Sequence, residues 1–318
     1  MDEALEDKRK KTIGWRAILI AGPTASGKSA LALDLAKRLD GVIINADSMQ
    51  LYEDLRLVSA RPSPSEERDA EHRLYGVLPA SQAFSTGAWL RMASAEIEAV
   101  WSEGRVPILV GGTGLYFKAL TQGLAELPDI PEDIRERARD LADREGVEGL
   151  RQALADAGDI VAAGELADPQ RLARALEVIL ATGQPLSVLQ KAQHATPFLP
   201  PEQALRLVLA PPRAWLHERI ARRAAMIVGE EGIEEVRALL GKGLSPKLPG
   251  MRAIGIAEIR DLLSQKASLD ETINRLTVAT RQYAKRQETW FRNQMTDWQR
   301  IDPSVGIDLE QLPGFAEK

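Results

Sequence analysis

Residues 17–29 read AILIAGPTASGKS, and this stretch decides the class of fold. Its first five residues are all apolar, as in a strand that is buried on both faces of a parallel sheet. A glycine-bearing turn follows, and residues 28–39 then carry leucines and alanines at helical spacing. A strand, a loop and a helix in this order form the opening unit of a nucleotide-binding type of α/β fold.

The turn itself fits the pattern G-x-x-x-x-G-K-[ST] of a phosphate-binding P-loop. Its glycines let backbone N–H groups curve around phosphate oxygens, Lys28 adds a positive charge, and the hydroxyl of Ser29 can bind Mg²⁺. The pattern leaves open whether the phosphates belong to ATP or to another diphosphate. The residues predicted to bind phosphate are Gly22, Pro23, Thr24, Ala25, Ser26, Gly27, Lys28 and Ser29.

Three further apolar runs, at residues 42–44, 106–110 and 205–209, predict more buried strands. Strands that alternate with helices form a mostly parallel sheet, and helices flank it. We therefore predict an α/β fold with a P-loop NTPase-like core. Ligands of such sheets bind beyond the carboxyl ends of the strands.

The middle of the chain differs in composition from this core. Residues 131–193 are rich in Ala, Leu, Arg and Glu without β-branched runs, which indicates several helices. A long helix is also expected over residues 269–297. We predict the following segments: a first part of the α/β core at 13–128, a helical insert at 129–200, a second part of the core with C-terminal helices at 201–300, and a loosely held, flexible tail at 301–318.

Composition restricts the function classes. The chain has no cysteine, which excludes disulfides and thiolate zinc sites. Its net charge of −5 argues against a uniformly basic nucleic-acid binder but not against a local basic face. The first apolar run, residues 17–21, is far too short for a signal or membrane segment. We therefore expect a cytoplasmic protein with no membrane contact.

Polar residues follow two of the predicted strands. Asp47 comes after residues 42–44, and Thr113 comes after residues 106–110. In a parallel sheet both loops lie at the same edge as the P-loop, so the two side chains can face one ligand. Asp47 fits three roles: a Mg²⁺-orienting acid of an ATPase, a helix N-cap, or a general base. Thr113 fits either a ligand contact or a turn or cap residue.

These loops, together with four later segments, resemble the tRNA dimethylallyltransferases, also called isopentenyl-tRNA transferases. The resemblance extends from about Ile18 to Asn293, with the motifs in the expected order. The later segments are Gln170–Arg174, Arg219–Ile220 with Arg223, Leu248–Gly255, and Thr280–Gln287 leading into Trp290 and Phe291.

The resemblance implies transfer of a dimethylallyl group from dimethylallyl diphosphate to N6 of adenosine 37 in the tRNA anticodon loop. The P-loop then holds the donor's diphosphate with Mg²⁺, and Asp47 is the base. Thr113 and Arg135 contact tRNA near the target adenosine, and the helical insert holds the anticodon stem. Lys28 and Arg223 stabilise the leaving diphosphate. The remaining residues expected to touch tRNA are Asp47, Ser48, Met49 and Gln50 in one loop and Gln170, Arg171, Leu172, Ala173 and Arg174 in the insert.

At three positions the chain departs from the family pattern. Arg61 stands where a lysine is usual, Ile256 where an aromatic residue is frequent, and Ala224 where one often follows Arg223. We expect these departures to affect details of tRNA contact and not the reaction. We also expect a monomer without an obligate protein partner. Two other functions remain open: a P-loop kinase of a small metabolite or nucleoside, and a non-catalytic RNA-binding protein with a vestigial loop.

The segment at residues 280–293 mixes cations with aromatic rings, which suits phosphate contact and base stacking but equally suits a solvated charged face with aromatic core anchors. The histidines are widely scattered, so we predict structural roles for them. Two tryptophans are expected in the core. The residues concerned are Arg281, Tyr283, Lys285, Arg286, Trp290, Phe291 and Arg292 in the segment, the histidines His72, His194 and His217, and the tryptophans Trp15 and Trp89.

Overall fold

A computed structural model describes residues 14–125, 129–192, 196–313 and 315. The chain divides into two units. The larger comprises Met1–Gln122 and Pro197–Lys318, and the smaller comprises Gly123–Thr196. The sequence placed the helical insert at 129–200. His194, one of the three histidines, lies outside the described residues.

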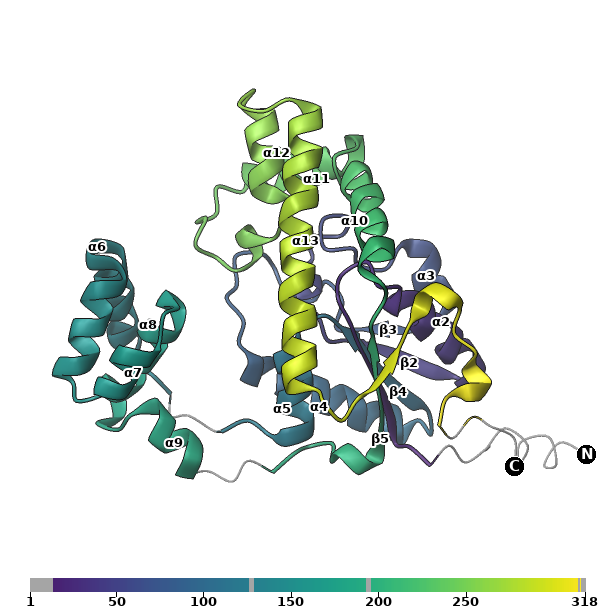
Figure 1. Ribbon diagram of the computed structural model, residues 1–318, viewed down its shortest axis with the longest axis horizontal. Coiled ribbons are helices and arrows are strands. Elements are labelled where there is room, and N and C mark those ends of the chain that lie inside the picture. The colour runs from purple at the N-terminus through teal and green to yellow at the C-terminus, as the bar shows by residue number, and fades with distance from the viewer. Residues whose placement is uncertain (1–13, 126–128, 193–195, 314, 316–318) are drawn as a thin grey trace, which may run out of the picture. The chain divides into compact units, whose positions relative to one another are not determined.

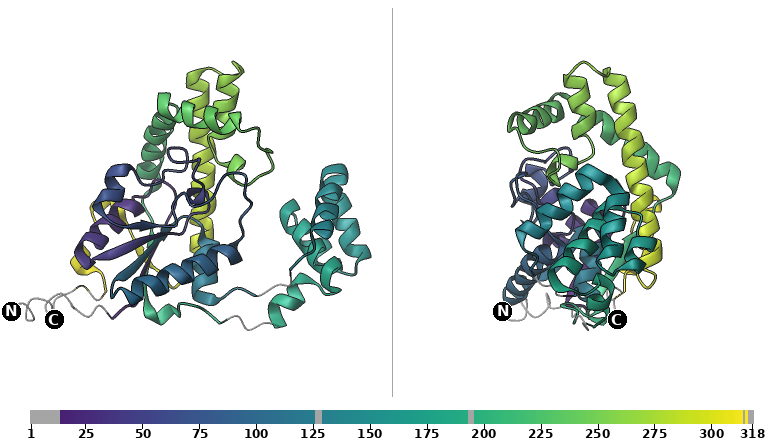
Figure 2. Two further views of the ribbon diagram at one scale, coloured as in Figure 1. Left: turned by 180° about the vertical axis from the view of Figure 1, so that it is seen from behind. Right: turned by 90° about the vertical axis from the view of Figure 1, so that its left-hand side faces the viewer.

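The larger unit is built on a six-stranded sheet in which all neighbouring strands pair in parallel (Figures 1 and 2). The strand order is β3-β2-β4-β1-β5-β6, so the strand that leads into the P-loop lies in the middle. This arrangement confirms the predicted α/β fold. The strands are β1 (Ala17–Ala21), β2 (Gly41–Asn45), β3 (His72–Arg73), β4 (Val106–Gly111), β5 (Ala204–Leu209) and β6 (Gln299–Ile301).

Helices cover both faces of this sheet (Figure 2). Helix α2 packs on one face, against alternate β1 residues such as Ile18 and Ile20. Helices α4, α5 and α13 pack on the other, against Leu19 and its neighbours. The helices of this unit are α2 (Lys28–Leu39), α3 (Pro64–Asp69), α4 (Thr86–Ser102), α5 (Gly114–Gln122), α10 (Arg213–Ile227), α11 (Glu230–Gly241), α12 (Ile256–Leu263) and α13 (Leu269–Gln294).

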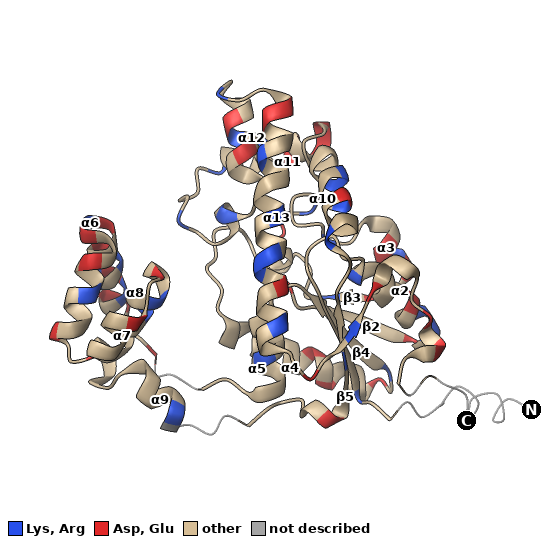
Figure 3. Cartoon of the chain, in the orientation of Figure 1, with Lys and Arg blue, Asp and Glu red and all other residues tan. Residues whose placement is uncertain are grey.

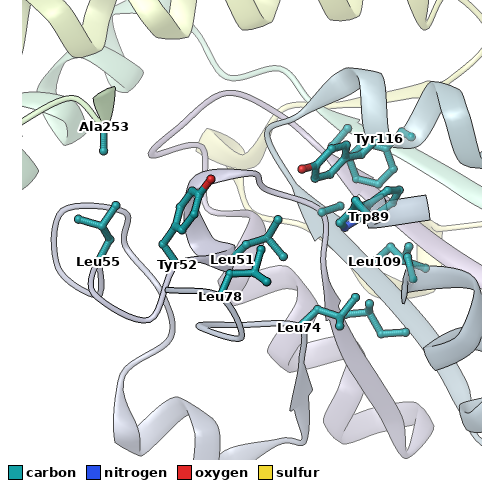
Figure 4. Packing of buried hydrophobic residues seen from close by; sticks show 14 of the residues in the cluster. Leu51, Tyr52, Leu55, Leu74, Leu78, Trp89, Leu109, Tyr116 and Ala253 are labelled. Carbon is teal, nitrogen blue, oxygen red and sulfur yellow. The ribbon is translucent and has the colours of Figure 1, made fainter. Parts of the chain in front are cut away.

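The second face carries the larger apolar cluster, shown in Figure 4. Trp89 of α4 is fully buried and stacks on Tyr116 of α5, with ring centroids 4.2 Å apart. Its indole N–H donates to the carbonyl of Asn45 at 3.0 Å. The predicted core role of Trp89 is therefore confirmed, and the residue anchors the end of β2, where the loop to Asp47 begins.

The smaller unit is helical. Its helices are α6 (Glu132–Asp156), α7 (Ile160–Glu165), α8 (Pro169–Thr182) and α9 (Leu186–Ala192). Gly146 interrupts α6 with a φ of 66°, a backbone conformation that glycine adopts without strain. The carboxylate of Asp168 caps α8 by accepting from the N–H of Arg171 at 2.9 Å. The core of this unit includes Leu150, Leu154 and Leu172.

The two edge strands of the sheet, β3 and β6, were not predicted, because two or three residues give no periodic pattern. In the described part of the segment 301–318, Leu312 and Phe315 are buried beside α2. Trp15 packs there too and donates to the carbonyl of Pro313 at 3.2 Å. No helix of the described part is long and apolar enough to cross a membrane.

Candidate active site

The loops that follow β1, β2 and β4 meet at the carboxyl edge of the sheet, as the sequence predicted. The first two of these loops and the end of β4, at Val110 and Gly111, line a cavity of about 390 Å³ within the larger unit, whereas Thr113 lies outside its lining. P-loop residues from Thr24 to Ser29 contribute to its wall, together with Asp47 and Gln50 from the loop after β2. Arg219 and Arg223 of α10 complete the lining with positive charge. A cavity with this lining suits an anionic ligand placed beside a carboxylate.

The carboxylate of Asp47 is held from two sides. Its Oδ1 accepts from the N–H of Met49 at 3.0 Å, and its Oδ2 accepts from the N–H of Gly112 at 3.3 Å. The side chain of Asn45 braces the same turn, because its Oδ1 accepts from the N–H of Asp47 at 2.8 Å. Asp47 therefore has a fixed orientation toward the cavity while keeping lone pairs for a proton.

The loops after β2 and β4 are also joined to each other. The hydroxyl of Thr113 accepts from the N–H of Ser48 at 2.9 Å and lies 3.3 Å from the Ser48 hydroxyl. A Cβ at Gly111 would lie only 1.9 Å from the carbonyl oxygen of Ala46, so this close approach requires glycine. Thr113 thus has a loop-joining role, whatever it contacts in a ligand.

Two partly buried cations face the P-loop. Burial lowers the pKa of Lys28 to about 8, an effect that Asp47 opposes and Arg223 adds to. The ammonium of Lys28 donates to the carbonyl of Pro23 at 2.8 Å. Burial likewise lowers the pKa of Arg223, and Asp47 acts against that shift. Both groups lack full solvation, which strengthens their attraction for an anion that enters the cavity.

Arg219 lies in one of the segments that resemble the family, but its role in the site was not predicted from the sequence. Its Nε donates to the carbonyl of Ala25 at 2.9 Å, and its guanidinium lies 4.6 Å from the ring centre of Trp215. Residues 219 and 223 are four apart on α10, so they share one face of the helix. That spacing, together with the Arg-rich segment, was the available sequence signal.

The residues present fit a magnesium ion that is bound with a diphosphate. Ser29 lines the cavity at the start of α2, near Asp47. Among the described residues, no three His, Cys, Asp or Glu side chains group to hold a metal. Mg²⁺ at phosphate sites needs only one or two protein ligands, with phosphate oxygens and water as the rest. A serine hydroxyl at the start of α2 is of the right type to be such a ligand.

The insert residues expected to touch tRNA belong to the smaller unit. Gln170 and Arg171 are exposed on α8, whereas Arg174 forms an ion pair with Glu177 at 3.0 Å. Leu172 is fully buried in the core of this unit, so its side chain is not exposed in the free protein. Ala173 packs against the same core. Arg135, on α6, lies 3.6 Å from Glu132.

In the loop after β2, the amide of Gln50 donates to the carbonyls of Ser59 and Ala60, at 3.0 and 2.7 Å. Met49 is half-buried against the core. The Gln50 side chain therefore stabilises the neighbouring backbone at Ser59 and Ala60 and also lines the cavity.

The three departures from the family pattern lie away from exposed surfaces. Ile256 and Ala224 are buried in the core. The guanidinium of Arg61 donates to the backbone carbonyls of Tyr52 and Glu53, at 3.3 and 3.0 Å. In the free protein these three side chains make contacts within the fold, and the expected effect on tRNA contact stays a prediction.

Helix α13 combines both interpretations that the sequence allowed. Phe291 is a fully buried core anchor, while Lys285 and Arg286 are exposed, and Figure 3 shows positive charge along this helix. A groove of about 510 Å³ lies along Lys285, Arg286 and half-buried Trp290.

The two described histidines have structural surroundings: His72 belongs to β3, where it pairs with Ile43 of β2, and His217 lies on α10. His72 lies with Nδ1 2.9 Å from the carbonyl of Ala70. The ring of His217 lies 3.5 Å from Arg213.

The parallel sheet, the phosphate-binding loop and the converging polar loops define a protein of the P-loop α/β class. Comparison with known proteins narrows this class. The family model described as IPP transferase matches residues 50–294. The chain therefore belongs to the IPP transferase family.

Individual relatives agree with this assignment. The tRNA dimethylallyltransferase of Allorhizobium ampelinum is 49% identical over 291 residues, which cover 91% of this chain and 95% of the relative. That of Agrobacterium fabrum is 50% identical, with 90% and 97% covered.

Solved structures give the same result. The tRNA isopentenylpyrophosphate transferase of Bacillus halodurans matches with a TM-score of 0.64 and 34% identity, over 90% of this chain and 89% of that one. A eukaryotic dimethylallyltransferase acting on tRNA matches with a TM-score of 0.77 and 25% identity, over 93% and 75%.

Proposed function

We propose that this protein transfers the dimethylallyl group of dimethylallyl diphosphate to N6 of adenosine 37 in the tRNA anticodon loop. Its family membership supports this function. The observation that carries the proposal is the cavity in which a carboxylate, Asp47, faces the phosphate-binding loop and Arg223. A leaving diphosphate needs the N–H groups and positive charge of the loop and Arg223, and an incoming nucleobase needs the carboxylate beside them.

The reaction replaces the C1–O bond of the donor with a C1–N6 bond and moves one proton from N6 to a base. N6 of the adenine attacks C1 of the dimethylallyl group, and the electrons of the C1–O bond leave with the diphosphate. The amino group is a poor nucleophile because its lone pair is delocalised into the ring. A base that takes the N6 proton as the bond forms lowers the barrier. Such a base typically raises the rate by about 10² to 10⁴. Asp47 accepts that proton in our proposal.

Stabilisation of the leaving diphosphate is the larger requirement. The P-loop N–H groups, Lys28 and Arg223 surround its position with positive charge that is already in place before the reaction. The Ser29 hydroxyl would hold Mg²⁺ together with the phosphates, and the ion would neutralise further negative charge. Fixed donors in a water-poor cavity stabilise developing charge more than mobile water does.

The tRNA part of the proposal rests on a single-stranded target. Removing a base from its stack costs a few kcal/mol, less in a loop than in a duplex. Thr113 and Arg135 then contact tRNA near the adenosine, and the exposed residues of α8 hold the anticodon stem. We expect the protein to act in the cytoplasm and as a monomer. Light scattering of the purified protein tests whether it is a monomer.

The test is incorporation of label into tRNA. Purified protein is incubated with tRNA and Mg²⁺, with either labelled dimethylallyl diphosphate or γ-labelled ATP. We expect label in tRNA from the prenyl donor only. Phosphate transfer from ATP to a small alcohol or nucleoside, without prenylation, would overturn the proposal in favour of a kinase.

A matched substrate tests the position of the modification. An anticodon stem-loop that carries adenosine at position 37 is compared with one that carries guanosine there. We expect labelling of the first RNA only. Equal labelling of both RNAs would contradict the assigned target atom.

A further inference from the structure

One buried polar side chain links two of the site's loops. The side-chain oxygen of Gln287 accepts from the N–H of Thr24 in the P-loop at 2.9 Å. Its side-chain nitrogen donates to the carbonyl of Gly112, in the loop after β4, at 3.0 Å. Gln287 is only 6% exposed and comes from α13, 263 and 175 residues away from its two partners.

The position of Gln287 on α13 would otherwise suit an apolar residue. Ala284, three residues earlier, is buried against α10 and the P-loop residue Ala25, and Phe291, four residues later, is buried in the main core. These spacings place all three side chains on one stripe of the helix. A polar residue on a buried stripe costs stability unless both its polar atoms are bonded, as they are here.

The chemistry of the two partners suits an amide. A backbone N–H can only donate and a carbonyl can only accept, so the linking side chain must offer one acceptor and one donor. A carboxylate offers acceptors alone, and an aliphatic chain offers neither. The space is tight as well, because a Cβ at Gly112 would lie 2.2 Å from the side-chain nitrogen of Gln287 and 3.0 Å from Asp47.

One of the two linked loops binds the diphosphate in our proposal, and the other contacts the proposed base. Thr24 belongs to the phosphate-binding loop, and the N–H of Gly112 is bonded to the carboxylate of Asp47. We infer that Gln287 is a positioning residue that fixes the distance between the diphosphate cradle and the base Asp47. This inference rests on the proposed function, since it assigns Gln287 to the transfer step. A shift of about 1 Å between reacting groups can cost about 100-fold in rate.

The test compares two variants of Gln287 with a control on the same helix. Gln287→Met keeps the length of the side chain and removes both bonds. Gln287→Glu keeps the shape but loses the donor to Gly112. Thr277→Val is the control, because Thr277 is also buried on α13 and its hydroxyl bonds only within the helix, to the carbonyl of Ile273 at 2.7 Å.

We expect Gln287→Met to lower kcat by about 10- to 100-fold, because the spacing between the P-loop and Asp47 is lost. The KM values for donor and tRNA should change by less than about threefold, because the surfaces that bind them remain. Thr277→Val should retain kcat within twofold. If Gln287→Met retains kcat within twofold, or if it raises KM alone, Gln287 does not position the reacting groups.

The pH profile of Gln287→Glu separates positioning from folding. When the carboxyl group of this variant is protonated, it regains a donor for Gly112, and burial beside Asp47 favours that protonated form. The ratio of variant to wild-type kcat should therefore rise as the pH is lowered from 8.5 to 6. The melting temperatures of both proteins are followed over the same range. A ratio that stays constant, or that follows the melting temperature alone, overturns the inference.

Hydrogen exchange tests the link without any activity. In the folded wild-type protein the amide of Thr24, followed by NMR, should exchange at least about 100-fold more slowly than in an unstructured chain, and Gln287→Met should remove most of this protection. Rapid exchange of this amide in the wild type overturns the link itself. If the wild-type protein does not prenylate tRNA at all, the proposed function fails, and the exchange result still decides whether Gln287 joins the loops.

Discussion

The guanidinium of Arg223 donates to the hydroxyl of Thr24 at 2.6 Å and, from its other nitrogen, to the carbonyl of Val58 at 3.0 Å. Thr24 is therefore held by α10 through its hydroxyl and by α13 through its N–H. Because Arg223 is fixed at both nitrogens, its charge faces the P-loop before any substrate arrives. A charge that needs no reorientation stabilises a leaving anion most effectively.

Replacement of Arg223 tests this role. Arg223→Met removes the charge, and we expect kcat to fall by about 10² to 10³. Arg223→Lys should recover only part of the loss, because a single ammonium cannot reach both Thr24 and Val58. Arg237→Met is the control, since Arg237 is an exposed arginine of α11 that pairs with Glu234. Equal activity of the Met and Lys variants of Arg223 would show that charge plays no part.

Glu235 holds the backbone of Val58, whose carbonyl accepts a hydrogen bond from Arg223. Its carboxylate accepts from the N–H groups of Arg56, Leu57 and Val58, at 2.9, 2.8 and 3.0 Å. We expect Glu235→Gln to lower the free energy of unfolding by about 1–3 kcal/mol, because an amide replaces one acceptor with a donor that faces N–H groups. Urea unfolding measures this loss.

The same substitution should also lower kcat, because the Val58 carbonyl that holds Arg223 is displaced. Glu234→Gln is the matched control, with its carboxylate exposed beside Arg237. If both variants unfold at the same urea concentration, Glu235 does not hold the loop.

The parts of the fold that the sequence predicted correctly are those with strong local patterns. Residues 17–29 combine a buried strand with a phosphate-binding loop, and this pattern is visible without any tertiary information. Strand β6, in contrast, exists because β5 offers it a partner, from Leu207 to Leu209. No periodicity within three residues could have indicated it.

The site shows the same division. Asp47 and Thr113 were predictable because both follow buried strands of one sheet. The burial of Leu172 was also predictable, because Leu172, Leu176 and Ile179 form the apolar stripe of α8. Gln287 could not have been assigned its role, since its partners lie far away in the sequence and only the packing of α13 brings them together.

Asp47 is predicted to act as the base, and two substitutions separate this role from its loop contacts. Asp47→Asn keeps an oxygen for the N–H of Met49 but does not accept a proton at neutral pH. We expect turnover to fall by at least about 10² in both Asp47→Asn and Asp47→Ala, with tRNA affinity within a few fold. Asp34→Asn, on the exposed side of α2, should have no effect. Unchanged single-turnover rates would exclude Asp47 as the base.

Arg171 should contribute to tRNA binding through its charge. It is exposed on α8, next to Leu172, whose burial fixes the orientation of that helix. Each phosphate contact that is lost weakens binding and reduces the slope of log K against log salt by about 1. We expect this change for Arg171→Ala in a filter-binding titration with the anticodon stem-loop. Arg144→Ala, at an exposed position of α6, is the control. Identical salt slopes for the two variants would remove Arg171 from the interface.

Lys28 should make diphosphate binding dependent on pH. Burial lowers its pKa from the ordinary 10.5 to about 8, so the free protein loses this charge as the pH rises above 8. An anion binds the protonated form better, and affinity should fall by up to about tenfold for each pH unit above that value. Calorimetry with inorganic diphosphate, in EDTA to exclude metal, measures the affinity between pH 7 and 9.5.

The pH dependence of stability has the opposite sign to the pH dependence of diphosphate binding. The unfolded chain keeps the lysine proton up to about pH 10.5, whereas the folded chain releases it near pH 8. The unfolded state therefore binds more protons in this window, and this group's contribution to the free energy of unfolding rises with pH. Lys28→Arg stays charged throughout, so its diphosphate affinity should not decrease from pH 7 to 9.5. An equally steep fall in affinity for Lys28→Arg would show that another group titrates, and Lys28 would then not be the cation that the diphosphate meets.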